Sequence, residues 1–147
     1  MDELRLYTIW FTQKSAEDFF TLLQINWVKT LLDTRINNKS QLAWFTKYPD
    51  LKFFLKQFWI DYVYEPLFAP TPELLSAYRK KKVNREQYEV IYNKLISDRR
   101  VEKIMEKYPI DNTCILCSEA TPEHCHRRLL AEYFKRNIPE IIKIIHL

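Results

Sequence analysis

The sequence predicts an α/β fold, a single domain over residues 1–147 in which helices flank a mostly parallel sheet of about five strands. Short apolar segments alternate along the chain with amphipathic segments, which is the order of βαβ units. With 147 residues, of which 47% are hydrophobic and 15% aromatic, the chain is long enough for one core and short for two. Because right-handed crossovers return the chain to the same edge, we expect parallel strands.

The first half of the chain begins with a strand at Leu4–Ile9, whose first residues alternate apolar and polar side chains. Ser15, followed by Asp18, resembles a helix start and predicts a short helix. An apolar run predicts the second strand at Val28–Leu32. Pro49 begins the next helix, which carries apolar residues at helical spacing.

The second half continues the same order of elements. A strand is predicted at Ile60–Tyr64, and Thr71 caps a helix that runs to about Lys82. Apolar residues at helical spacing then predict a long or broken helical segment that reaches about Lys107. The last predicted elements are a strand at Cys114–Cys117, a helix from about Pro122 and a strand at Ile141–Ile145.

Charge, hydropathy and cysteine count narrow the class of protein. The formal net charge of +4 suits an anionic small molecule or nucleic acid as partner, without indicating a dedicated polyelectrolyte binder. No apolar run reaches the length of a membrane span and the N-terminus lacks a signal-peptide pattern, so we expect a cytoplasmic protein without a membrane partner. Three cysteines, two of them on one predicted strand, argue against a disulfide framework and predict reduced thiols.

Glycine is absent from the chain. Gly-rich loops that bind phosphate need residues that adopt positive φ or allow close backbone approach, so such loops are excluded. A helix N-terminus with arginines nearby is the remaining way to bind an anion, and the segment after Pro122 provides it.

Open parallel sheets bind ligands beyond the carboxyl ends of their strands. The side chains that we expect to line one crevice there are Trp10 and Phe11, Asp33 and Arg35, Tyr64 and Glu65, and Cys117, Ser118 and Glu119. The helix from Pro122 begins beside this crevice and carries Cys125, His126 and Arg127 near its N-terminus. Unpaired N–H groups and the helix dipole favour anions at that position and lower thiol pKa values.

Each of these residues also has a structural interpretation. Cys114 is expected in the core, on the opposite face of its strand from Cys117. Cys125 lies at helical spacing with apolar residues, and His126 is equally well explained as a satisfied buried histidine. Arg127 follows a glutamate by four residues, which suits an ordinary surface ion pair.

No cofactor is expected, and a zinc ion is the alternative. Cys117, Cys125 and His126 are residue types that bind zinc. Their spacing lacks the paired-cysteine pattern of structural zinc, and adjacent residues on a helix project about 100° apart.

The residues of this C-terminal segment carry a resemblance to a known family. The runs from Ile115 to Glu119 and from Pro122 to Ala131 resemble the signature of domain of unknown function 488, a bacterial and archaeal family. Asp33-Thr34-Arg35 is similar to the family's Asp-x-Arg segment, whereas Trp10 stands where members commonly have glycine and would narrow the crevice. The resemblance implies a fold and a shared site without an established reaction. It favours as site residues Asp33, Arg35, Cys117, Glu119, Cys125, His126 and Arg127.

The leading hypothesis is an enzyme that acts on a phosphorylated or nucleotide-like small molecule at this crevice. Substrate-binding residues would be Arg35 and Arg127, which hold the anion, together with Trp10 and Tyr64. The expected catalytic residues are Asp33 or Glu119 as acid, base or partner of His126, and Cys117 or Cys125 as nucleophile or structural thiol.

Two alternatives belong to other classes of protein. In a nucleic-acid-binding module, Trp10, Phe11 and Tyr64 would stack on bases. The basic residues from Arg79 to Arg85 would contact phosphates. In a Cys-His site without catalysis, the same motif would bind metal or lock the last helix to the sheet.

Overall fold

The computed structural model describes residues 4–39, 43–117 and 126–147 and confirms the predicted α/β fold. In these residues five parallel strands form one sheet, in the order β3-β2-β4-β1-β5. The strands are β1 (Leu4–Trp10), β2 (Thr30–Asp33), β3 (Asp61–Tyr64), β4 (Thr113–Cys117) and β5 (Ile141–His146). The α-helices are α1 (Ala16–Ile25), α2 (Asp50–Gln57), α3 (Pro72–Arg79), α4 (Arg85–Asp98), α5 (Val101–Met105) and α6 (His126–Asn137). Two short 3₁₀ helices are η1 (Trp44–Thr46) and η2 (Pro66–Phe68).

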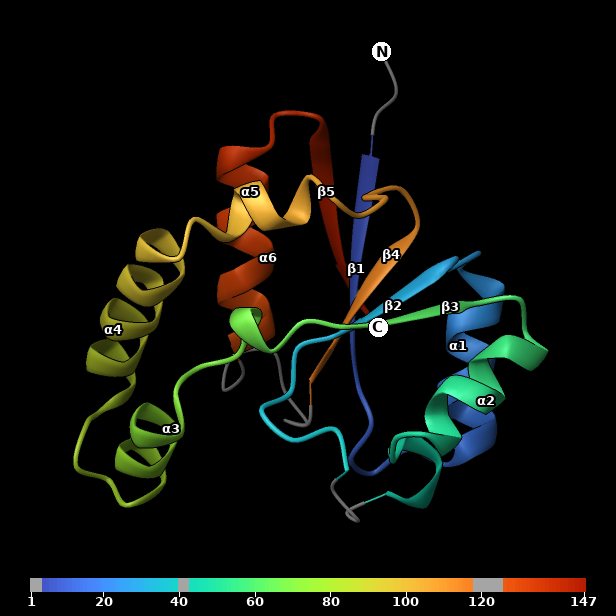
Figure 1. The fold of residues 1–147 in the computed structure, drawn as a ribbon, viewed down its shortest axis with the longest axis horizontal. Coiled ribbons are helices and arrows are strands. Elements are labelled where there is room, and N and C mark those ends of the chain that lie inside the picture. Colours follow the sequence, from blue (N-terminus) through green and yellow to red (C-terminus); the bar gives the residue numbers. More distant parts are fainter. Residues whose placement is uncertain (1–3, 40–42, 118–125) are drawn as a thin grey trace.

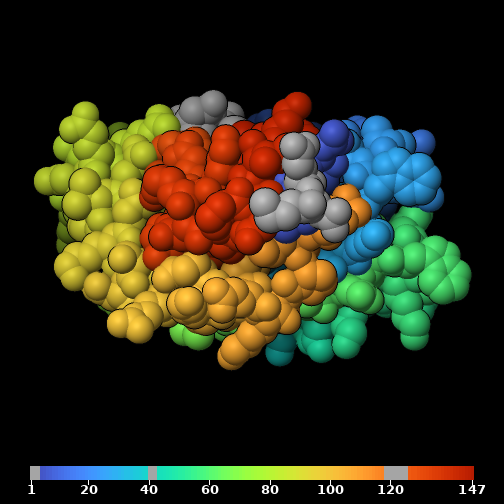
Figure 2. Space-filling model, turned by 90° about the horizontal axis from the view of Figure 1, so that it is seen from above, coloured from blue at the N-terminus to red at the C-terminus, as the bar shows by residue number. Residues whose placement is uncertain are grey.

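Helices cover both faces of the sheet (Figure 1). Helices α1 and α2 pack on one face over a core that includes Phe19, Leu31 and Leu51. Helices α3 to α6 cover the other face over a second core that includes Tyr92 and Phe134. Figure 2 shows the molecule from above, with α6 between the end formed by α3 and α4 and the end formed by α1 and α2. The central strands β2 and β4 are buried at every residue, so their carboxyl ends are fixed from both sides.

The helix starts follow the capping pattern of the sequence. Ser15 Oγ accepts a hydrogen bond of 3.0 Å from the Asp18 amide at the start of α1, and Thr71 caps α3 in the same way. Helix α3 ends at Arg79, short of the predicted Lys82, because the chain turns there. The predicted start near Pro122 lies outside the described residues.

Turns that glycine usually makes are made here by larger residues. The non-glycine residues with positive φ are Gln13, Trp27, Trp59, Lys81, Arg100 and Asn112. A left-handed conformation costs a residue with a side chain about 1–2 kcal/mol, so tertiary contacts must offset it. Arg100, with φ of 51°, separates α4 from α5 and explains why the long helical segment is broken. No helix in the described residues has the length and apolar composition needed to cross a membrane.

Candidate functional site

The carboxyl edge of the sheet brings together side chains that are far apart in the sequence. In the ladder, Trp10 lies opposite Cys117, and Asp33 lies opposite Leu116. The ends of β1, β4 and β2 are therefore adjacent, and the first turn of α6 contacts them through His126 and Arg127. Three of the expected site residues lie outside the described residues, and these are Ser118, Glu119 and Cys125.

Asp33 and Arg35 form a buried, bidentate ion pair at the carboxyl end of β2. Arg35 Nε donates to Asp33 Oδ1 at 2.8 Å, and Arg35 Nη2 donates to Asp33 Oδ2 at 2.7 Å. The Tyr62 hydroxyl donates to the same Oδ2 at 2.7 Å, and Arg35 Nη2 also reaches the Thr46 carbonyl. Burial and the neighbouring Asp33 charge raise the pKa of Tyr62, which therefore stays a hydrogen-bond donor. Both carboxylate oxygens of Asp33 are thus engaged in holding Arg35.

This ion pair leaves one donor of Arg35 available for another group. Arg35 Nη1 is buried and has no hydrogen-bond partner among the residues that the structure describes. The guanidinium carbon lies 5.3 Å from the centre of the Phe11 ring, and Phe11 is itself buried. Asp33 and Thr46 fix the orientation of this guanidinium, and Nη1 remains as a donor for a further acceptor. The group is therefore preorganised to bind an anion.

His126 links the start of α6 to the residue after β2. Its Nε2 lies 3.0 Å from the Thr34 carbonyl oxygen and 2.9 Å from Thr34 Oγ1. A carbonyl oxygen only accepts, so Nε2 carries the proton and Nδ1 carries the lone pair. Burial lowers the pKa of His126 to about 4, and the nearby Arg127 charge adds to this effect, against the Thr34 hydrogen bond. The imidazole is therefore neutral at pH 7.

Arg127 is fully buried between α6 and the strand ends. Its Nη1 donates to Cys117 Sγ at 3.2 Å, and its guanidinium carbon lies 4.9 Å from the centre of the Trp10 ring. Trp10 is half-buried. Because the Arg127 guanidinium lies over its ring, it limits the access of a ligand to that ring. The expectation of an ordinary surface ion pair for Arg127 is wrong, because its side chain is turned inward.

Cys117 is disulfide-bonded, which corrects the expectation of reduced thiols. Of the two cysteines on β4, Cys114 is free, as expected, whereas Cys117 is disulfide-bonded. In this form Cys117 is not a nucleophile. Once reduced, its sulfur would have the Arg127 guanidinium beside it, which favours a thiolate.

Cys114 is a core residue, as the sequence predicts. It is buried on the α1 and α2 face, opposite the face on which Cys117 contacts Arg127. Burial raises the pKa of the Cys114 thiol well above its ordinary value. Cys114 is therefore inert.

Tyr64 and Glu65 have structural partners at the end of β3. The Tyr64 hydroxyl donates to the Ile36 carbonyl at 2.7 Å, and the Tyr108 hydroxyl donates to Glu65 at 2.8 Å. Burial and the Asp33 charge raise the pKa of Tyr64. These contacts shape the loop after β2 and the start of η2.

Lys14 is a site residue that the sequence patterns do not mark. Its Nζ is buried 2.9 Å from the centre of the Trp10 ring and has no hydrogen-bond partner within the described residues. It lies in the loop after β1, four residues beyond Trp10. Nothing in the spacing of this loop distinguishes Lys14 from an ordinary exposed lysine, so only the tertiary structure identifies it.

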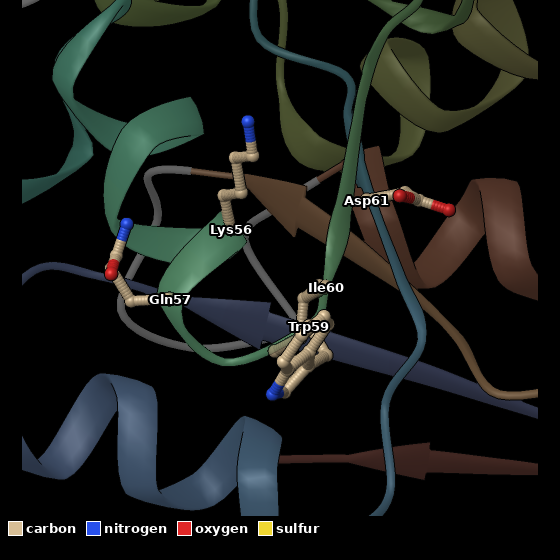
Figure 3. Close-up of a pocket in the computed structure, with 5 residues that line it drawn as sticks. All are labelled: Lys56, Gln57, Trp59, Ile60 and Asp61. Carbon is tan, nitrogen blue, oxygen red and sulfur yellow. The ribbon is translucent and has the colours of Figure 1, made fainter.

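The described residues contain no group of three metal-binding side chains. A hollow of about 440 Å³ lies elsewhere, at the amino end of β3, and is lined by Lys56, Gln57, Trp59, Ile60 and Asp61 (Figure 3). Their polar ends point away from one another, so they do not converge on a common ligand. The carboxyl edge, with Lys14, Arg35 and Arg127, is therefore the better candidate site.

Together these features define an α/β protein with a cationic, partly aromatic site at the carboxyl edge of a parallel sheet. A family model described as "Domain of unknown function DUF488" matches residues 15–134, and the chain belongs to this family. The match covers α1 to most of α6 and so includes Arg35, Cys117 and Arg127, while Lys14 immediately precedes it. Comparison with curated proteins and with solved structures finds no match.

Proposed function

We propose that this protein is an enzyme that binds a phosphorylated or nucleotide-like small molecule at the carboxyl edge of its sheet. The observation that supports the proposal is the pair of buried cationic atoms, Lys14 Nζ and Arg35 Nη1, that lack a hydrogen-bond partner in the described residues. A buried polar group without a partner costs about 1–3 kcal/mol, and more when it is charged. The oxygens of a bound phosphate would supply the missing acceptors.

The neighbouring residues suit this proposal in distinct ways. Asp33 fixes the orientation of Arg35, so this guanidinium would lose little conformational entropy on binding an anion. Arg127 adds positive charge over the Trp10 ring. Neutral His126 has Nδ1 as its basic atom, although its low pKa makes it a weak base. Glu119 stays a predicted catalytic residue and lies outside the described residues.

A nucleic-acid-binding module gains less support from the geometry. Phe11 is only 1% exposed, and Lys14 and Arg127 both lie over the Trp10 ring. The basic residues from Arg79 to Arg85 lie at the connection of α3 and α4, away from the strand ends (Figure 1). The aromatic and basic residues of that hypothesis therefore do not form one surface.

Calorimetric titration with inorganic phosphate and with AMP tests the proposal. Lys14→Met removes a buried ammonium but keeps the length of its stem, so we expect a higher melting temperature together with at least tenfold weaker phosphate binding. Lys29→Met, at an exposed lysine before β2, is the control for the loss of one charge and should change neither quantity. Equal phosphate affinity in Lys14→Met and wild type, or no binding of either ligand to wild type at millimolar concentration, would contradict the proposal.

A further inference from the structure

Lys14 is oriented in the opposite way to most lysines. A lysine usually lays its aliphatic stem on the protein and keeps its ammonium in water. The Lys14 side chain is only partly buried, yet its Nζ is buried and lies against the Trp10 ring. The amine, rather than the stem, is therefore the part that is withdrawn from solvent.

The backbone before Lys14 fixes this orientation. The Lys14 amide donates to the Phe11 carbonyl at 3.3 Å and closes a tight turn after β1. Within this turn Gln13 has a φ of 63°, in the left-handed region that a residue with a side chain enters at a cost. Strained backbone of this kind is frequent where function requires one side-chain direction.

Burial and the Arg127 charge favour the neutral amine of Lys14, whereas the face of the Trp10 ring favours its ammonium form. Burial, and to a smaller extent the Arg127 charge, lower the pKa of Lys14 to about 8, against smaller opposing effects of Cys114 and Asp18. Arg127 lies on α6, Cys114 on β4 and Asp18 on α1. With this pKa, about a tenth of the side chains carry the free amine at pH 7.

We propose that Lys14 is a nucleophilic amine that forms an iminium adduct with an aldehyde or ketone bearing an anionic group such as a phosphate. This inference rests on the proposed function, because Arg35 and Arg127 would bind the anionic group. A desolvated lysine beside another cation is the usual setting for Schiff-base chemistry. Trp10 adds an apolar surface beside the amine.

The reaction at Lys14 balances without a further reactant. The free amine attacks the carbonyl carbon, a C–N bond forms, and the carbonyl π electrons move to oxygen. A proton then passes from nitrogen to this oxygen and gives a neutral carbinolamine. Protonation of the hydroxyl and loss of water give the iminium ion, in which nitrogen carries the positive charge. The net change is the uptake of one carbonyl compound by protonated lysine and the release of one water molecule.

Pyridoxal 5′-phosphate, an aldehyde with a phosphate group, is a suitable probe. The protein is incubated with this compound and sodium cyanoborohydride, which reduces an iminium to a stable amine, and labelled peptides are quantified by mass spectrometry. We expect Lys14 to be labelled at least tenfold faster than exposed Lys29, and inorganic phosphate to slow the labelling of Lys14 alone.

Lys14→Arg is the control for the label, because arginine cannot form the iminium, and the fast labelling should disappear in this variant. Phosphate binding by the wild-type protein, measured in parallel, separates this inference from the proposed function. Labelling of Lys14 at the rate of Lys29, with phosphate binding intact, would overturn the inference and leave the proposed function standing. Absence of phosphate binding in wild type would overturn both.

Discussion

Asp33 and Arg35 are locked together by two parallel hydrogen bonds of 2.8 and 2.7 Å, and their side chains are only 0% and 4% exposed. The Tyr62 hydroxyl donates a further hydrogen bond to the Asp33 carboxylate, and the Thr46 carbonyl accepts one from the Arg35 guanidinium. The two parallel hydrogen bonds offset the cost of burying both charges at the end of β2, a strand that is covered on both faces. Its consequence is that Asp33 serves to position Arg35.

The Asp33–Arg35 pair predicts a large effect of removing one charge. Asp33→Asn leaves Arg35 as an uncompensated buried cation and should lower the free energy of unfolding by about 3–5 kcal/mol. Tyr62→Phe removes one hydrogen bond to the same oxygen and should lower it by about 1 kcal/mol. Urea denaturation of both variants at pH 7 measures the two values. Equal losses in the two variants would mean that the charge pair is not what stabilises this strand end.

His126 predicts a loss of stability in acid. Its folded pKa of about 4 lies below the ordinary value of 6.5, so the unfolded chain binds the proton more readily. The stability is complete above pH 6.5, falls as pH decreases toward 4, and has then lost about 3 kcal/mol through this residue. His126→Gln can still donate to Thr34 but does not titrate. The free energies of unfolding of wild type and this variant should therefore diverge between pH 7 and pH 4.5, and parallel curves would contradict the assignment.

The cysteines predict a specific labelling pattern. In the native protein, iodoacetamide should leave Cys114 unmodified, because it is fully buried and its thiol pKa is raised. In urea without reductant, Cys114 should react and Cys117 should not, since Cys117 is disulfide-bonded. After reduction both should react. Alkylation of Cys117 in the unreduced, unfolded chain, read by peptide mass spectrometry, would show that its disulfide is absent in solution.

The fold could be predicted from the sequence because its signals are local. Apolar runs and capping residues such as Ser15 and Thr71 place most strands and helix starts within a few residues of where they lie. The parallel sheet follows from their alternation, and so does the meeting of Trp10, Asp33 and Cys117 at one edge. What the local pattern lacks is the order of strands, which depends on how the crossovers pack.

The contacts of the site are less predictable, because they depend on tertiary directions. The position of Arg127 in the sequence suits a surface ion pair, but on α6 its side chain points into the protein interior. Lys14 has no recognisable pattern at all, since the turn at Gln13 determines where its amine points. The pairing of Asp33 with Arg35 joins two residues that the sequence assigned to separate roles, as catalytic group and as anion ligand.

Arg127 and Lys14 are electrostatically coupled, which gives a prediction independent of any ligand. Because the Arg127 charge depresses the pKa of Lys14, Arg127→Met should move that pKa from about 8 toward its ordinary value of 10.5. Arg127→Lys keeps the charge and should leave it close to the wild-type value. The pH dependence of competitive acetylation at Lys14, with exposed Lys29 as the internal reference, measures the shift in folded protein. If Arg127→Met and Arg127→Lys give the same profile, burial alone sets the reactivity of Lys14, and the guanidinium contributes only to anion binding.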